Sequence, residues 1–456
     1  MVVVRTSSGS RLVRAVAGSL VIATLLFGVA RPARANPEPP ATYDARVVGM
    51  GGTAVSYFQG PASLYHNPAG MDGIEGFEIT ASLTNLMVRF RAPFAGAGSE
   101  TTSDMNYAPL FFLGGGARVS RRVTVGLGAY ISTGFGGGFQ RLTRIGTGTG
   151  TCIDDPVTGV HDDNGTDYCP ATPTDQTVFL VVGELAVPVS VRIYDNLRLG
   201  VALRLPYAQE SVRAIQEVQN LVYKPVEQDV SGLGIPGVLL GVQWDATSWL
   251  SLGFSYRSKV WIDMSGETRV DLFDTGTPTT IPTTTRWNVP HAFRFGAAFH
   301  ALNRRLLLTT ELKIQLHHEA NKEQVFHLDG PAPPDDVIRA DFNWRNVYLL
   351  SAGAEFMALP WFALRLGASG SRSATPPSTM TPFTPPAGIL LAAYGGFGLR
   401  SDNLDVDLGF AWGGGAAVHI AENGTRCEPG DRVKAGCSGS YDVNSYFLSV
   451  SAVWRR

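Results

Sequence analysis

Charged residues are sparse in this sequence, and long apolar runs are absent beyond its first 35 residues. Asp, Glu, Lys and Arg together make up 17% of the 456 residues. A helix needs about 20 consecutive apolar residues to cross a bilayer, and no stretch after residue 35 comes near that length. We therefore expect no transmembrane helix in the mature chain.

Catalytic and metal-binding signatures are also missing. The sequence has no G-x-S-x-G, no H-E-x-x-H and no phosphate-binding loop, although these motifs mark many hydrolases and nucleotide-binding proteins. Aspartates at positions 154, 155, 162, 163 and 167 make one loop acidic, but without EF-hand spacing. We expect a solvated loop there, with Ca²⁺ bridging to lipid headgroups as the alternative. The sequence predicts no enzymatic activity, no catalytic residue, no cofactor and no metal site.

Residues 1–35 have the features of a cleaved signal peptide. A basic start precedes a short apolar core over residues 15–30, and Ala33-Arg34-Ala35 supplies a cleavage site before Asn36. The segment holds five of the 37 basic residues and none of the 39 acidic ones. The exported chain is therefore acidic overall, and it lacks the basic field that would attract nucleic acid.

The mature chain instead contains strands with clean two-residue alternation. In one of them Leu197, Leu199, Val201, Leu203 and Leu205 alternate with arginine, glycine and alanine. Similar runs occur over residues 250–256, 293–299, 308–316 and 404–410. Period two places one set of side chains on each face of a strand. An outer-membrane barrel needs this pattern, because each strand has lipid on one side and a polar lumen on the other.

The connectors between these strands alternate between short and long. We place short turns near residues 120–121, 194–196, 245–248, 302–304, 359–360 and 401–403. Long polar stretches lie between them, over residues 92–103, 136–174, 209–224, 271–285, 318–341, 371–386 and 413–440. Short periplasmic turns and long outer loops are typical of bacterial outer-membrane barrels. Six turns and seven loops predict an all-β transmembrane antiparallel barrel of about 14 strands.

The four cysteines form two local pairs. Cys152 and Cys169 fall in one expected outer loop, and Cys427 and Cys437 fall in another. Because the periplasm is oxidising, we predict a disulfide within each pair. Free or metal-bound thiols are the alternative, although no C-x-x-C spacing supports metal.

Residues 36–75 precede the strands and do not alternate. They are rich in Gly, Pro and Ala, with glycines at 49, 51 and 52 and an Asn67-Pro68 pair just before the first strand. Such a compact segment of small residues is either a plug inside the barrel or a disordered leader.

A resemblance favours the plug. The run Gly49-Met50-Gly51-Gly52-Thr53-Ala54, followed by Ala62-Ser63-Leu64-Tyr65-His66-Asn67-Pro68-Ala69-Gly70-Met71, resembles the N-terminal hatch of the FadL/TodX family. These are outer-membrane transporters of long-chain fatty acids and aromatic hydrocarbons. Weaker echoes follow in order, at 253–258, 290–296, 344–355 and 364–367.

The resemblance implies three parts: a signal peptide over residues 1–35, a hatch over 36–75 and a barrel over 76–456. The hatch residues that match the family are Gly49, Gly51, Gly52, Asn67, Pro68, Ala69 and Gly70. It also implies capture of a hydrophobic ligand from outside, passage to a site near the hatch, and exit sideways into the membrane. In the family a kink in the third strand opens this side exit. Here the corresponding candidates are Gly134, Gly136, Gly137 and Gly138, which alternatively just begin an outer loop.

The chain departs from the family pattern at its end and in two loops. Family members usually end on an aromatic residue, whereas this chain ends on Arg455-Arg456. The cysteines and acidic residues of two outer loops also lie outside the general pattern. These departures bear on assembly and on how the loops capture a ligand.

Arginines on the polar phase of the strands are the candidate ligand-binding residues. A guanidinium group suits a ligand carboxylate, and the candidates are Arg204, Arg257, Arg294 and Arg365. The alternative is a solvated or mutually paired barrel interior.

We interpret the chain as a monomeric transporter of the bacterial outer membrane that takes up long-chain fatty acids or hydrocarbons and contacts membrane lipids. A general diffusion porin and a structural or adhesive barrel are the alternatives. A hatch would distinguish the transporter, because it would obstruct a porin.

Overall fold

The computed structural model describes most of the chain beyond its N-terminal segment. The described residues are 43–94, 100–145, 151–155, 159–162, 169, 172–218, 222–271, 277–331, 336–384, 386–415, 417–420 and 439–456. The expected signal peptide and the pair Cys427 and Cys437 lie outside them.

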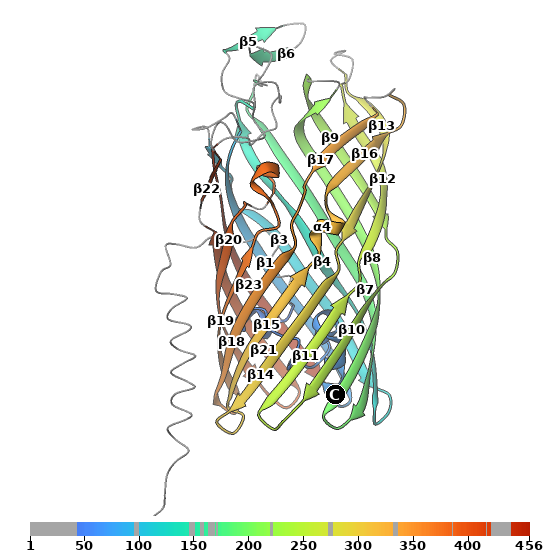
Figure 1. Cartoon of the computed structure of the whole chain (residues 1–456), viewed down its shortest axis with the longest axis vertical. Helices are drawn as coiled ribbons and strands as arrows, with labels where there is room; N and C mark the ends of the chain where they lie inside the picture. Colours follow the sequence, from blue (N-terminus) through green and yellow to red (C-terminus); the bar gives the residue numbers. More distant parts are fainter. Residues whose placement is uncertain are drawn as a thin grey trace, which may run out of the picture.

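Fourteen antiparallel strands close into a barrel (Figure 1), as the alternation predicts. In ring order they are β1 (Phe77–Pro93), β3 (Asn106–Arg118), β4 (Val123–Leu142), β7 (Thr174–Tyr194), β8 (Leu197–Val218), β10 (Gly237–Asp245), β11 (Leu250–Arg257), β14 (Ala292–Ala301), β15 (Leu306–Gln315), β18 (Val347–Leu359), β19 (Phe362–Arg372), β20 (Ile389–Arg400), β21 (Leu404–Gly415) and β23 (Gly439–Arg455). Pairing of β1 with β23 closes the ring, so each of these fourteen strands has a neighbour on both sides.

Shorter elements extend the barrel at its outer end. They are β2 (Glu100–Thr102), β5 (Cys152–Asp155), β6 (Gly159–Asp162), β9 (Val222–Leu233), β12 (Val260–Val270), β13 (Thr279–Val289), α4 (His317–Ala320), β16 (Glu323–Leu328), β17 (Val337–Asp341), η2 (Pro377–Thr379) and β22 (Val418–Ile420). The β5–β6 hairpin stands above the barrel in Figure 1.

The six short turns are confirmed, but several of the expected outer loops contain strands, among them β13, β16 and β17. Residues 209–218 and 222–224 belong to β8 and β9, which form a long hairpin. Likewise β4 continues to Leu142, so Gly136–Gly138 lie within a strand. The polar and glycine-rich composition of these stretches has weak strand propensity, so the sequence did not predict strands there. Backbone pairing with a neighbouring strand stabilises them nevertheless.

The two faces of the strands separate as the alternation predicts. On β8, Leu199, Val201, Leu203 and Leu205 have exposed fractions of 40–47%, whereas the intervening Arg204 is fully buried. The exposed apolar face suits lipid, and the other face forms the interior. None of the helices among the described residues is long and apolar enough to span a membrane.

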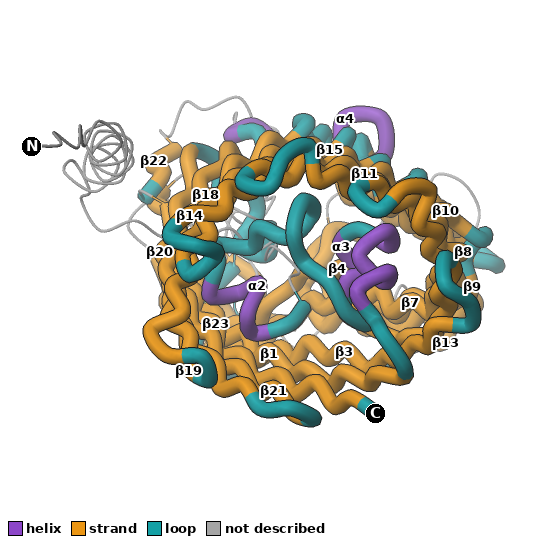
Figure 2. The backbone as a smooth tube through the Cα atoms, turned by 90° about the horizontal axis from the view of Figure 1, so that it is seen from below, coloured by secondary structure: helices purple, strands orange, loops and turns teal. Residues whose placement is uncertain are grey.

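Residues 43–74, here called the inner segment, lie inside the ring of strands, where Figure 2 shows α2 (Ala45–Gly49) and α3 (Ser63–His66). Asp44 caps α2 by accepting a hydrogen bond from the backbone N–H of Arg46 (2.8 Å). A 3₁₀ helix, η1 (Pro68–Gly73), then leads to β1. Nearly every residue of the inner segment is buried, so its small side chains pack against the barrel wall.

Glycines on the inner face of the barrel make room for this packing. A Cβ atom on Gly200 would lie 2.2 Å from the Ala69 nitrogen, and one on Gly353 would lie 2.3 Å from the Met50 carbonyl oxygen. Side chains at these positions would therefore exclude the inner segment. The sequence shows the glycines, but only the folded barrel shows what approaches them.

Candidate functional site

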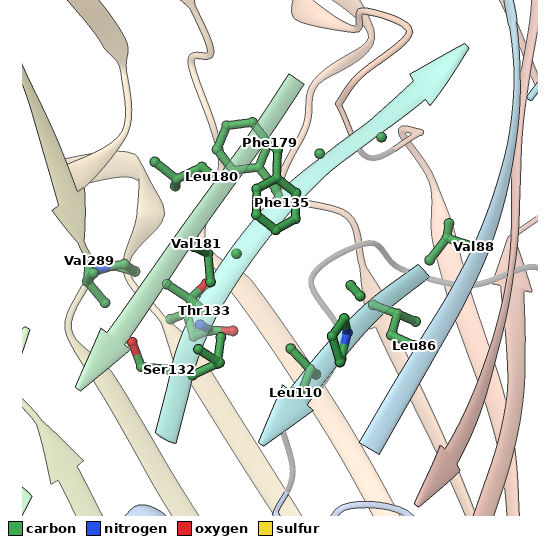
Figure 3. A pocket seen from close by; sticks show the side chains of 18 of the residues that line it. Leu86, Val88, Leu110, Ser132, Thr133, Phe135, Phe179, Leu180, Val181 and Val289 are labelled. Carbon is green, nitrogen blue, oxygen red and sulfur yellow. The ribbon is translucent and has the colours of Figure 1, made fainter. Parts of the chain in front are cut away.

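A cavity of about 340 Å³ lies inside the barrel, between the outer halves of β1, β3, β4 and β7. Figure 3 shows apolar side chains of β1 and β3 facing those of β4 and β7 across it, including Leu86, Val88, Leu110, Leu180 and Val181. Tyr65 and His66 of α3 line its inner end. Its volume and apolar lining suit a small hydrophobic molecule.

The cavity opens where two neighbouring strands separate. The ladder between β3 and β4 ends at the pair Phe112 and Tyr130. Beyond that point β3 stays paired with β1, and β4 stays paired with β7. At the outer end Asn106 closes the gap, because its Oδ1 accepts a hydrogen bond from the Gly138 N–H (2.8 Å). The four glycine candidates on β4 all line this cavity.

A bulge in β4 reverses which side chains face inward. The register between β4 and β7 shifts between Ile131 and Thr133. Tyr130 is the inward residue before the shift, whereas Phe135 is paired with the buried Leu180 after it. One extra residue in a strand moves every later side chain to the opposite face. The bulge therefore turns Phe135 and Phe139 into the lumen.

Two of the four candidate arginines line the cavity. Arg257 forms an ion pair with Glu184 and lies over the Tyr65 ring, with its Cζ 5.3 Å from the centroid. Arg294 donates to Nδ1 of His66 (3.1 Å) and lies 5.5 Å from the same ring. Lys313 also lines the cavity. This cationic inner end is continuous with the apolar space above it.

The other two candidate arginines lie outside the cavity lining. Arg204 is fully buried, pairs with Glu184 at 3.0 Å and donates to the Ser258 carbonyl (2.7 Å). Arg365 pairs with Glu355 (2.6 Å) and Asp407 (2.7 Å). Alternation identified all four as interior residues, but it carries no information about which partner each one meets.

Asn67 connects the inner segment to the barrel. Its Nδ2 donates to the carbonyls of Val55 (2.7 Å) and Val242 (2.9 Å), and its Oδ1 accepts from the Ala69 N–H (3.1 Å). Pro68 and Ala69 follow in η1. A Cβ on Gly70 would lie 2.3 Å from the Phe58 carbonyl oxygen. The Asn-Pro-Ala-Gly run is therefore tightly packed and hydrogen-bonded at this position.

The earlier glycines of the inner segment lie at the C-terminal end of α2, where the chain packs against the barrel wall. Gly49 is the last residue of α2, and a Cβ there would lie 3.2 Å from that of Arg365. Gly51 and Gly52 have φ values of 71° and 83°, a region that favours glycine. A residue with a side chain at either position would be strained.

Buried carboxylates hold the inner segment in place. Asp72 forms ion pairs with three barrel arginines, Arg118, Arg192 and Arg198. At the other end Arg46 forms a two-point contact with Glu355 (2.8 and 2.7 Å). The sequence gives no local sign of these ion pairs, because their partners lie far apart along the chain.

A third contact joins the middle of the inner segment to the barrel. Glu311 on β15 accepts hydrogen bonds from the backbone N–H groups of Ala54 (2.7 Å) and Val55 (3.0 Å). The same side chain pairs with Arg294 at 3.4 Å. The cavity arginine and the inner segment therefore share one carboxylate.

His66 couples the inner segment to this cavity arginine. Its Nε2 contacts the Tyr43 carbonyl (2.9 Å) and its Nδ1 faces Arg294. Burial, reinforced by the Arg294 charge, lowers the pKa of His66 well below its ordinary value. The ring is therefore neutral at physiological pH.

Cys152 and Cys169 form a disulfide across the base of the β5–β6 hairpin. The hairpin stands above the outer end of the barrel (Figure 1). The disulfide fixes the ends of a loop that the sequence predicts to be acidic.

A closed 14-stranded barrel with an apolar exterior and a filled lumen is the architecture of an outer-membrane β-barrel protein. The sequence model for the outer membrane protein transport proteins (OMPP1/FadL/TodX) matches residues 44–455. The chain belongs to this family.

Solved structures share the fold at low sequence identity. A Pseudomonas aeruginosa FadL homologue is 16% identical, with a TM-score of 0.70, over 93% of this chain and 100% of that one. The Pseudomonas putida toluene transporter TodX is 16% identical, with a TM-score of 0.65, over 91% and 98%. The CymD monoaromatic hydrocarbon channel is 13% identical, with a TM-score of 0.64, over 92% and 99%. No curated protein sequence matches this chain significantly.

Proposed function

We propose that this protein takes up hydrophobic small molecules, either long-chain fatty acids or hydrocarbons, across the outer membrane. The observation that carries the proposal is the apolar cavity at the gap between β3 and β4, directly above the inner segment. A water-filled porin needs neither feature. The structures similar in fold include proteins described as toluene transporters and a monoaromatic hydrocarbon channel.

The proposed route leads from the cavity through the wall into the bilayer. Beyond the pair Phe112 and Tyr130, the outer parts of β3 and β4 are not paired with each other. Separating them there breaks no ladder hydrogen bond. Each methylene kept out of water contributes about 0.8 kcal/mol. A hydrophobic ligand therefore favours this lateral path over an aqueous pore.

The cationic inner end suggests how an acidic ligand would be oriented. Arg257 and Arg294 would attract a carboxylate, while the apolar walls receive the chain. A neutral hydrocarbon would use the apolar walls alone. Comparing a fatty acid with the alkane of equal length distinguishes these two ligand classes.

The proposed organisation is a mature chain that starts at Asn36, a plug over residues 36–75 and a monomeric barrel over 76–456 surrounded by lipid. N-terminal sequencing of the outer-membrane protein tests the first point. Size analysis in mild detergent tests the monomer.

The direct test is mass spectrometry of molecules that copurify in mild detergent, combined with uptake by cells expressing the protein. We expect a hydrophobic compound in the preparation and faster uptake of that compound than by cells with an empty vector. Uptake of polar solutes at comparable rates would support a general diffusion porin. Normal uptake after shortening all the outer loops would argue against loop-based ligand capture.

A further inference from the structure

Next to the cavity lies a cluster of aromatic rings, here called the aromatic cage, formed by Trp287, Phe342 and Trp344. Their ring centroids lie 5.0–6.0 Å apart. All three side chains are at least nine-tenths buried. The Phe135 ring of β4 lies against all three, with centroid distances of 5.3 Å to Trp287, 6.2 Å to Phe342 and 5.8 Å to Trp344.

The three residues of the cage are held firmly by their backbones. Trp287 lies in β13, which is paired with β12 along its whole length. The N–H groups of Phe342 and Trp344 donate to the carbonyls of Lys322 (2.8 Å) and Asn321 (3.1 Å). These bonds fix the cage as a preformed space for one aromatic ring.

Phe135, by contrast, belongs to a part of the wall that is paired with a neighbouring strand on one side only. It lies between Gly134 and Gly136 in the stretch of β4 that β3 does not pair with. Gly136 has a φ of 140°, which a residue with a side chain would rarely adopt. Phe135 itself lines the transport cavity. Its ring is therefore the member of the cluster that faces the proposed ligand path.

Two polar groups of the cage lack partners. The indole Nε1 atoms of Trp287 and Trp344 are buried and have no hydrogen-bond partner among the described residues. Buried N–H groups are almost always paired in proteins, and an unpaired one costs free energy. The Phe135 ring fills the space but supplies no acceptor.

We infer that the aromatic cage is a second ligand subsite, which takes a small aromatic ring bearing a hydrogen-bond acceptor when Phe135 moves out. Such a ligand repeats the ring packing of Phe135 and adds the acceptor that the indoles lack. The inference rests on the proposed transport function and specifies a ligand class and a second binding position along the transport route. Phe135 acts as a specificity-determining residue, since only a ligand that packs better than its ring displaces it.

The test compares two bromine-labelled probes of similar shape, 4-bromoacetophenone, which carries a carbonyl, and 1-bromo-4-ethylbenzene, which does not. Equilibrium dialysis of each probe against the full-length protein in mild detergent measures its dissociation constant without using the cage tryptophans as reporters. We expect the dissociation constant of the ketone to be about 3- to 10-fold lower than that of the ethylbenzene, as one added hydrogen bond supplies. In W287F/W344F, which keeps two aromatic rings without the indole N–H groups, this preference should vanish.

Phe135→Ala should lower the dissociation constant of the ketone, because no ring must then be displaced. The matched control is Phe139→Ala, which removes the same side chain from the same face of β4. Phe139 packs against Phe94 (4.7 Å), Phe383 (5.8 Å) and Phe90 (6.3 Å) instead, and it does not line the cavity. The control leaves Phe135 and the cage intact, so its dissociation constant for the ketone should equal that of the unaltered protein.

Equal behaviour of the two alanine variants, or a ketone preference that survives W287F/W344F, would overturn the inference. Comparison of the unaltered protein with W287F/W344F decides the matter even if Phe135→Ala fails to fold. Failure of the proposed function looks different, because the unaltered protein would then neither take up nor bind either probe.

Discussion

The two ends of the barrel interior are filled by opposite chemistry. At the periplasmic end, polar hydrogen bonds and ion pairs fix the inner segment, with Asp72, Glu311 and Glu355 as the main acceptors. At the outer end, aromatic and aliphatic side chains surround a cavity, and strand pairing is incomplete. Buried ion pairs require exact geometry, whereas apolar packing tolerates rearrangement. The first region therefore suits a fixed closure, and the second suits a ligand path.

Removing the inner segment should have the largest effect. Deletion of residues 43–74 empties the periplasmic half of the lumen and leaves its arginines and carboxylates facing water. We expect a barrel that still assembles but conducts ions, measured as single-channel current in planar bilayers. Deleting the β5–β6 hairpin, which stands outside the ring, is the control and should leave conductance unchanged. Equal conductance of both deletions would mean that the inner segment does not close the lumen.

Breaking one ion pair of the periplasmic half should be the next largest change. Glu355→Gln leaves the buried guanidinium of Arg365 and the contact to Arg46 without a full counter-charge. Removing one partner of a buried pair costs about 3–5 kcal/mol, visible as unfolding at lower temperature in a gel-shift assay. The matched change Asp263→Asn affects a pair exposed on both sides and should leave the transition in place. Similar transitions for both variants would show that the buried pair adds no stability.

Narrowing the outer cavity should slow transport without unfolding the barrel. A Cβ at Gly137 would lie 2.4 Å from the Phe90 ring, whereas one at Gly183 would have no neighbour closer than 3.8 Å. For Gly137→Val we expect uptake of a hydrophobic ligand to fall roughly tenfold, equivalent to about 1.4 kcal/mol in the barrier. Gly183→Val, on the neighbouring strand, should transport normally. If Gly137→Val transports normally as well, the ligand does not pass this gap.

Acidification should have the smallest effect of these changes, a weakening of the contact between His66 of the inner segment and the barrel. Because burial and Arg294 lower the pKa of His66 in the folded protein, the unfolded state binds protons more readily below pH 6.5. The contribution of His66 to stability is present above that pH and falls as pH drops, by at most about 1.4 kcal/mol per pH unit. The hydrogen-exchange protection of residues 60–70, taken relative to the intrinsic exchange rate at each pH, should fall by up to about tenfold between pH 6.5 and 5.5. His66→Gln, which has no titrating ring, should remove that pH dependence, and an unchanged pH dependence would show that other groups cause it.

The sequence by itself determined the barrel, its outward face and its short turns. Alternation such as that of Leu199, Val201 and Leu203 is a local property with period two, so neighbouring residues suffice to reveal it. The Asn67-Pro68-Ala69 motif was recognised by its resemblance to the family hatch, and only its local turn depends on residues close in sequence. Parts of β4 and β8 were interpreted as loops because their residues have weak strand propensity. Pairing with neighbouring strands stabilises them.

Only the tertiary structure decided what the interior residues do. Arg257 and Arg365 look alike in the sequence, yet one lines the cavity and the other lies between Glu355 and Asp407. The inward turn of Phe135 depends on a bulge that only the register with β7 reveals. Its cage joins β4 to residues about 150 or more positions later in the chain. Contacts across a closed barrel have no sequence period, because ring closure and strand register set them.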